Sequence, residues 1–446
     1  MTDLSGFPAA EVQFDRTAGV VGSTADALTL ATDPATTDLL VLSHGWNNDM
    51  DEARQLYRNL ASSLRAVADG GAVPGLPTRK IGILGVLWPS KKFADAHLIP
   101  GGAAAAASPI DAGLILAQIQ QLREIFPDPA AQRTLDVVAA LVPQLPDRAT
   151  ARASFADQLR SLLDPTAAER EDGSTELFAV PGRTLMDRLA VPVSLAPPHG
   201  TGGAAAALGP TARAGDARGG AAGLGSLLGG VWGAALNLVN FTTYYEMRAR
   251  AGDIGARGLA PLLTQIHATR PELRIHLAGH SFGGRLVTAA ANALRADASA
   301  ALATLTLLQA AFSHYGFADD WDSTRPGGQP GFFRSVIADK KVTGPILITH
   351  TGNDLAVGIA YAIASRIAGQ VAAAVGDAND IYGGIGRNGA QKTPETVPGE
   401  LLDVGGGYRW QPQRPHNLLA DRFIANHSDV TGRQVVYAVL SALATT

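Results

Sequence analysis

A strand, a tight turn and a helix follow one another within residues 271–296, which read PELRIHLAGHSFGGRLVTAAANALRA. Apolar residues alternate with polar ones from Leu273 to Leu277, which is the period of a strand. From Leu286 to Leu294 the apolar residues instead recur at the spacing of one helix face. The turn between the two elements must therefore be very short, and it carries the sequence GHSFG.

This turn, Gly279-His280-Ser281-Phe282-Gly283, fits the pattern G-x-S-x-G. A nucleophile held on a strained strand-to-helix turn needs neighbours without a Cβ, because strand and helix nearly touch there. The turn lifts the Ser281 hydroxyl clear of the sheet, and the start of the following helix favours developing negative charge. We therefore interpret Ser281 as a catalytic nucleophile, and the alternative is an ordinary glycine-rich turn.

The sequence GHSFGG between a strand and a helix resembles the nucleophile turn of the α/β-hydrolase superfamily, particularly of its esterase- and lipase-like serine hydrolases. The resemblance covers roughly residues 38–92 and 241–446. It implies a sheet of mainly parallel strands with helices on both faces and a large helical cap inserted between two strands. It also implies a catalytic triad in the chain order serine, acid, histidine.

Four further segments read as buried strands, because each is a short apolar run that ends in turn residues. They are residues 38–43, 81–87, 303–308 and 345–350. Helix patterns alternate with these strands, so the sequence predicts an α/β fold. The alternation breaks down after residue 90, and residues 200–225 are low in complexity. We therefore expect two parts of an α/β-hydrolase core, 1–92 and 241–446, separated by a cap or lid insertion, 93–240.

A histidine-glycine pair, His44-Gly45, follows the first of these strands. Acyl transfer needs two backbone N–H groups directed at the oxyanion of the tetrahedral intermediate. The resemblance assigns one of them to Phe282, directly after the serine, and the other to Trp46. We also expect a substrate site that includes His44, Gly45, His280 and Trp88. The alternative for His44-Gly45 is a turn that only ends the strand.

A serine hydroxyl is a poor nucleophile until a histidine accepts its proton and a carboxylate orients that histidine. The acid should follow Ser281 and stand at the carboxyl end of a strand, and Asp354 meets both conditions. The alternative is a group of acids that follows the preceding strand at a greater distance. This group consists of Asp319, Asp320 and Asp322.

The histidine of such a triad should lie in the last loop before the final helix. His427 does, within the sequence N-H-S-D, and His416 is the competing candidate. We therefore expect Ser281, Asp354 and His427 to form the catalytic triad.

The composition excludes several other functions. A net charge of −4 without a basic run gives no reason to expect a nucleic-acid partner. The chain has no cysteine, so disulfides and thiol catalysis are excluded. Residues 384–389 fit G-x-G-x-x-G, but no strand precedes them and no helix pattern follows, so we expect no dinucleotide site. We expect no metal and no other cofactor, and the N-terminus lacks a signal-peptide pattern, which favours the cytoplasm.

Residues 219–245 carry no charge. The run is long enough to cross a bilayer, but its many glycines and its place between two halves of a soluble fold favour a buried or lid helix. Contact with a membrane surface and a true span are the alternatives. Because such a run is costly to leave in water, we expect it to line an apolar acyl pocket beside Ser281.

These features predict a serine hydrolase that cleaves carboxylic esters, with a small-molecule or lipid-like ester as its substrate. Two alternatives stay open. The same triad could serve a lipase, a phospholipase, an amidase or an acyltransferase. The fold could also belong to a protein without catalytic activity that binds a membrane or a partner.

Overall fold

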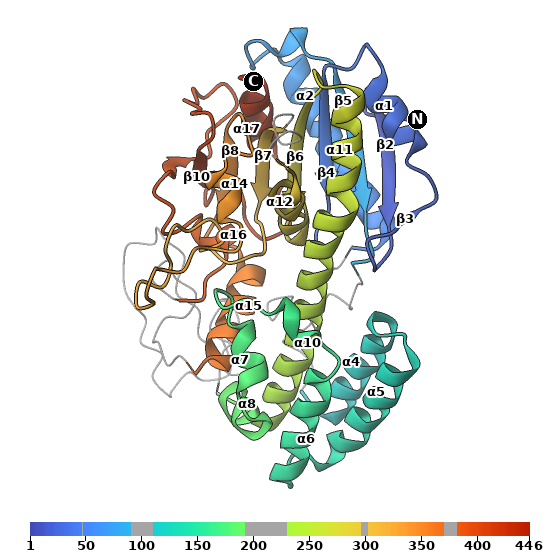
Figure 1. Cartoon of the computed structure of the whole chain (residues 1–446), viewed down its shortest axis with the longest axis vertical. Helices are drawn as coiled ribbons and strands as arrows, with labels where there is room; N and C mark the ends of the chain where they lie inside the picture. The colour runs from blue at the N-terminus through green and yellow to red at the C-terminus, as the bar shows by residue number, and fades with distance from the viewer. Residues whose placement is uncertain (47, 91–109, 192–229, 296–301, 370–380) are drawn as a thin grey trace, which may run out of the picture. The chain divides into compact units, whose positions relative to one another are not determined.

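The computed structural model describes residues 1–46, 48–90, 110–191, 230–295, 302–369 and 381–446. The chain divides into two units, both drawn in Figure 1. Unit 1 comprises Met1–Ser90, Met247–Val357 and Gly384–Thr446, and unit 2 comprises Lys91–Glu246 and Gly358–Gly383. The chain therefore leaves unit 1 for unit 2 twice. The second of these segments, Gly358–Gly383, is one that the sequence analysis assigns to the core.

Unit 1 is built on a ten-stranded mixed sheet with the order β1-β2-β5-β4-β6-β7-β8-β10-β9, and β3 pairs with β2. In this spatial order, every pair of neighbouring strands from β2 through β10 to β9 is parallel. Strands β1 and β3 instead run antiparallel to β2. The predicted α/β class with a mainly parallel sheet is thereby confirmed. The strands are β1 (Thr2–Leu4), β2 (Phe7–Phe14), β3 (Val20–Val21), β4 (Asp38–Ser43), β5 (Ile81–Leu87), β6 (Arg274–His280), β7 (Leu302–Leu308), β8 (Ile346–His350), β9 (Val397–Glu400) and β10 (Pro415–Leu419).

Helices cover both faces of this sheet, which explains why every residue of β4, β5 and β7 is buried. On β5, a Cβ added to Gly82 would meet Leu30 at 3.0 Å and one added to Gly85 would meet Tyr57 at 3.0 Å, so α1 and α2 lie on opposite faces. Helix α12, in front of the central strands in Figure 1, contacts α11, which contacts α1, while α17 packs beside α2. The helices of unit 1 are α1 (Ala25–Thr32), α2 (Met50–Asp69), a π-helix (Ile254–Leu259), α11 (Ala260–Thr269), α12 (Phe282–Ala293), α14 (Arg334–Ala338), α16 (Ile385–Asn388) and α17 (Arg433–Leu443).

The described part of unit 2 is helical. Its helices are α4 (Ala112–Ile125), α5 (Pro129–Leu141), α6 (Ala149–Arg160), α7 (Ser174–Ala179) and α8 (Gly182–Leu189), and it shares α10 (Gly230–Asp253) and α15 (Leu355–Ile367) with unit 1. Residues 230–245 of the uncharged run belong to α10, and residues 219–229 lie outside the described residues. Within unit 2 the ring of Tyr244 meets that of Tyr361 edge to face at 6.4 Å. In the described part of the chain, no helix has both the length and the apolar character that a membrane span requires.

The carboxyl ends of the central strands lie level with one another. Ser43 pairs with Gly279 across β4 and β6, His280 pairs with Leu308 across β6 and β7, and Leu308 pairs with Thr349 across β7 and β8. The segments that leave these strands therefore begin side by side. In open parallel sheets, ligands bind at this edge.

Candidate active site

Ser281 is the single residue between the end of β6 at His280 and the start of α12 at Phe282. Its backbone has φ 57° and ψ −125°, a conformation that residues other than glycine seldom adopt and that costs on the order of 1–3 kcal/mol. The end of β7 holds it there, because Ser281 N–H donates to Leu308 O at 3.1 Å and Ser281 O accepts from Ala311 N–H at 3.0 Å. The strained turn expected from GHSFGG is therefore present, with the serine at its apex.

Two glycines of this turn have no room for a side chain. A Cβ on Gly283 would lie 2.2 Å from the carbonyl oxygen of Ser43, and a Cβ on Gly279 would lie 2.2 Å from that of Gly283. Both obstacles are backbone atoms, which cannot turn aside as the end of a side chain could. Close approach of strand, turn and helix thus explains the glycines on either side of Ser281.

His44, expected at the substrate site, is fully buried and fixes the loop after β4. Its Nδ1–H donates to Gly45 O at 2.9 Å and its Nε2 accepts from Trp88 N–H at 3.2 Å. Trp88, also fully buried, returns a bond from its indole N–H to His44 O at 3.0 Å. Burial lowers the pKa of His44 to about 4, so the ring is neutral at ordinary pH, as these bonds require. The hydrogen bonds of His44 and Trp88 thus fix the conformation of the loop that follows β4.

The loop that His44 fixes passes directly over the serine. A Cβ on Gly45 would lie 2.5 Å from the Cβ of Ser281 and 3.1 Å from its Oγ. The next residue, Trp46, has its ring 6.0 Å from the ring of Phe282. The two residues expected to supply oxyanion N–H groups, Trp46 and Phe282, are therefore neighbours beside Ser281.

His427 and Asp354 form a hydrogen-bonded pair. Nδ1 of His427 lies 2.8 Å from Oδ2 of Asp354, whose side chain is completely buried. The other carboxylate oxygen, Oδ1, accepts the N–H of Val357 in the first turn of α15 at 3.0 Å. Each oxygen of Asp354 thus has a separate donor, and His427 is held as the tautomer with its proton on Nδ1. That tautomer leaves Nε2 as the proton acceptor.

His280 links this pair to the nucleophile turn. It immediately precedes Ser281, its Nε2–H donates to the backbone oxygen of His427 at 2.8 Å, and the two imidazole rings are 4.8 Å apart. Burial, and secondarily the neighbouring His427, lower the pKa of His280 to about 3. A neutral His280 can support the loop of His427 without placing a second positive charge beside it.

Two further residues, which the sequence analysis did not name, tie the acid loop to the histidine loop. The carboxylate of Asp421 accepts from Thr351 Oγ1 at 2.6 Å and from Gly352 N–H at 3.0 Å. The amide of Asn353 donates to the backbone oxygens of Asp421 at 3.1 Å and Ile424 at 2.9 Å. The only sequence signal for them is position, because both stand in loops that follow the ends of parallel strands.

The predicted residues therefore lie together at the carboxyl ends of the strands, but one hydrogen bond expected of a triad is not formed in the described part of the chain. Within the described residues, no hydrogen bond joins Ser281 Oγ to His427 Nε2. Such bonds are often long in proteins without substrate and tighten when it binds.

The competing candidates lie elsewhere. His416 is near the start of β10, where it pairs with Leu347 and not with the carboxyl end of the sheet. Asp319 faces Arg334 at 3.5 Å, and Asp320 accepts the backbone N–H of Gln329 at 2.8 Å. Asp319 thus interacts with the start of α14 and Asp320 with its own loop, and neither contact involves His427.

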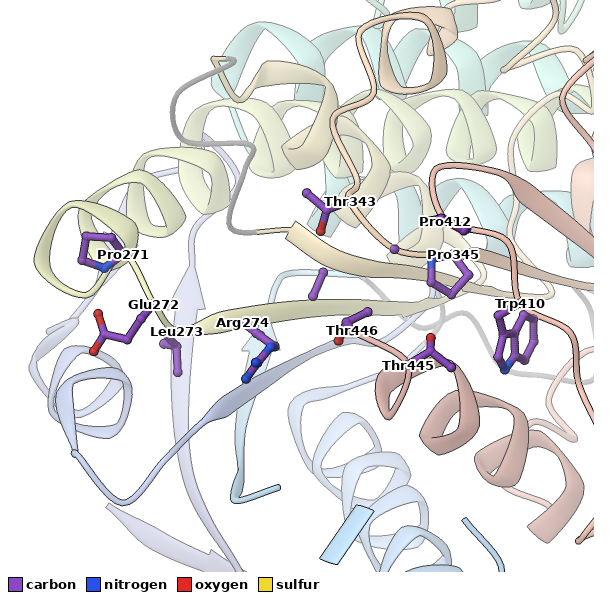
Figure 2. A pocket seen from close by; sticks show the side chains of 12 residues that line it. Pro271, Glu272, Leu273, Arg274, Thr343, Pro345, Trp410, Pro412, Thr445 and Thr446 are labelled. Atoms are coloured by element: carbon purple, nitrogen blue, oxygen red, sulfur yellow. The ribbon is translucent and has the colours of Figure 1, made fainter. Parts of the chain in front are cut away.

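A cavity of about 360 Å³, shown in Figure 2, occurs at the opposite edge of the sheet. Arg274 begins β6 on one side of it, Pro345 precedes β8 on another, and the ring of Trp410 closes a third. Because it lies at the amino ends of the strands, this cavity is not part of the site around Ser281.

No protein-family model, curated protein or solved structure matches this chain. The functional argument therefore rests on the residues at the carboxyl edge of the sheet. These are the strained serine, the glycine loop above it and the buried carboxylate with its histidine.

Proposed function

We propose that this protein is a serine hydrolase of the α/β-hydrolase fold that cleaves carboxylic esters through an acyl-enzyme formed on Ser281. One observation carries the proposal. The hydrogen-bonded pair of Asp354 and His427 stands at the same edge of the sheet as Ser281, with His280 in contact with the loop of His427. A buried carboxylate that fixes the tautomer of a histidine is the arrangement that activates a serine hydroxyl.

In the proposed reaction, Ser281 Oγ attacks the acyl carbonyl and His427 Nε2 takes its proton. Asp354 holds the imidazolium that forms, through the Nδ1–H bond of 2.8 Å. The backbone N–H groups of Phe282 and Trp46 stabilise the oxyanion of the tetrahedral intermediate. His427 then returns the proton to the leaving alcohol, and a water molecule activated by the same histidine releases the acyl group.

A fluorophosphonate probe tests this proposal, because it reacts covalently with activated serines. We expect one equivalent to attach to Ser281, located by mass spectrometry of the digested protein, and to abolish hydrolysis of p-nitrophenyl esters. Ser281→Ala should block both labelling and hydrolysis. Ser62→Ala, at an exposed serine of α2, is the matched control and should behave as the unchanged protein. Hydrolysis that survives in Ser281→Ala, or labelling confined to another serine, would refute the proposal.

A second expected result concerns the loop above the serine. Gly45→Ala should lower kcat/KM by at least about a hundredfold, since the new Cβ would lie 2.5 Å from the Cβ of Ser281 and must displace either the serine or the oxyanion loop. Ester hydrolysis together with a thermal melt measures the effect. Gly407→Ala serves as the control, because nothing lies within 4 Å of its added Cβ. Activity within threefold of the original protein in Gly45→Ala would mean that this loop does not adjoin the reacting group.

A further inference from the structure

Gln309 occupies the same position after β7 that Ser281 occupies after β6. It directly follows Leu308, the last residue of its strand, and its backbone also has a positive φ, 46°. The residue is completely buried. A buried glutamine in a strained conformation needs surroundings that fix it, and its amide must find partners for its oxygen and its two N–H groups.

The contacts of the Gln309 amide fix which way it points. Thr349 Oγ1 donates to Gln309 Oε1 at 2.8 Å, so the nitrogen faces away from β8. Gln309 Nε2 then donates to the backbone oxygen of Gly386 at 2.8 Å and to Asp354 Oδ2 at 3.4 Å. The oxygen that receives the longer of these bonds is the same one that His427 contacts.

The glycine-rich segment 384–389 supplies the second anchor of this amide. Gly386 N–H donates to Ala310 O at 3.0 Å, and Gly386 O accepts from Thr351 N–H at 3.0 Å. A Cβ on Gly386 would lie 2.6 Å from the carbonyl carbon of Gln309, so only glycine allows this approach. The segment that fits G-x-G-x-x-G thus packs its backbone against Gln309, the residue that contacts Asp354.

We propose that Gln309 is a positioning residue, whose amide holds the Asp354 carboxylate in the orientation that His427 requires. This inference rests on the proposed function, because it gives Gln309 a role in the same triad. The chain of contacts runs from Thr349 through Gln309 and Asp354 to His427. Because the amide of Gln309 restrains rotation of the Asp354 carboxylate, that carboxylate keeps its hydrogen bond to His427 for more of the time.

Charged and titratable groups from three other segments also lie near the loops of Asp354 and His427. Arg387, on α16, interacts with the carboxylates of Asp354 and Asp421, and burial lowers its own pKa. Asp421 lies in the loop after β10, and His280 ends β6. None of these groups changes when Gln309 is replaced, so a change in the titration of His427 can be ascribed to position 309.

Two substitutions separate the contributions of the amide. Gln309→Met keeps the length of the side chain but removes both N–H donors, and we expect kcat to fall about ten- to a hundredfold with KM within twofold. Gln309→Glu places a second carboxyl group beside Asp354. Two buried carboxyl groups in contact cannot both ionise freely, so the new glutamate competes with His427 for a proton, and the titration of His427 should differ from that of the unchanged protein. The acid limb of the pH–rate profile should move with it.

The titration of His427 is measured by NMR on protein labelled with ¹³C at histidine Cε1, and His427→Gln assigns its signal. This readout does not require activity. If the unchanged protein neither labels with the fluorophosphonate nor hydrolyses esters, the proposed function fails, while the NMR comparison still decides the role of Gln309.

Matched controls come from Gln413, another glutamine at positive φ, in the loop before β10. Gln413→Met and Gln413→Glu should leave both kcat and the titration of His427 unchanged. Circular dichroism checks that each variant is folded, and Gln309→Met decides the matter if Gln309→Glu is not. The inference is overturned if folded Gln309 variants match the Gln413 variants in kcat and in the titration of His427.

Discussion

Ser281→Ala, His427→Ala and the double substitution are expected to lower kcat by the same factor, on the order of 10⁴-fold or more. Members of a triad act as a unit, so removing the second gives no further loss once the first is gone. In the proposed mechanism, the serine provides the oxygen that attacks, and the histidine, which lies 2.8 Å from Asp354, provides the base. Single-turnover kinetics with a p-nitrophenyl ester, on protein purified free of contaminating esterases, measures all three rates.

His416→Ala is the control for this experiment. Its ring bonds to the backbone of Gln411, near the start of β10, and its loss should leave turnover almost unchanged. Losses that multiply in the double variant would show that His427 acts outside the triad. A collapse of activity in His416→Ala alone would point to the competing histidine.

Asp354→Asn should have the second-largest effect, a fall in kcat of about 10⁴-fold with the fold retained. The carboxylate uses Oδ1 for the N–H of Val357 and Oδ2 for the ring of His427. An asparagine has only one oxygen. If that oxygen caps α15, the amide NH₂ faces Nδ1 of His427 and stabilises the wrong tautomer, whose proton is on Nε2. The histidine then has no lone pair for the serine proton.

The measurement is a pH–rate profile of Asp354→Asn beside Asp320→Asn. Asp320 serves its own loop through the N–H of Gln329, so its variant should keep close to full activity. The assignment of the acid is wrong if Asp354→Asn turns over normally and Asp320→Asn does not.

The central strands could be predicted from the sequence because burial on both faces leaves a mark that one chain displays. Residues 39–42 and 81–87 contain no polar side chain, and the strands that include them, β4 and β5, are buried throughout. The last two strands in the sheet order, β10 and β9, carry no such apolar run. β10 begins with Pro415 and includes His416 and Asn417, and three of the four residues of β9 are exposed. Their pairing depends on neighbours that the local pattern does not reveal.

Some residues of the candidate site could likewise be predicted from the sequence, and others could not. The glycines around Ser281 have a local cause, which is the close approach of backbone segments at the turn, and the sequence therefore displays them. Asp354 and His427 were predicted from chain order and from their places in loops. Gln309, Asn353 and Asp421 were not, because each acts on a segment distant in sequence. The sequence shows that a polar residue follows a strand, but not which loop it meets.

Strands β4 and β6 are neighbours in the sheet, yet Asp38 of β4 and the histidine it bonds on β6, His276, are 238 positions apart in the chain. Closing a loop of that length costs chain entropy before any strand pairing offsets it, and domains dominated by such distant contacts fold slowly. During synthesis, β4 and β5 emerge long before the strand that must lie next to β4. A growing chain that already contains Ser281 still lacks the loops of Asp354 and His427, so the proposed triad can form only after residue 427 has been synthesised.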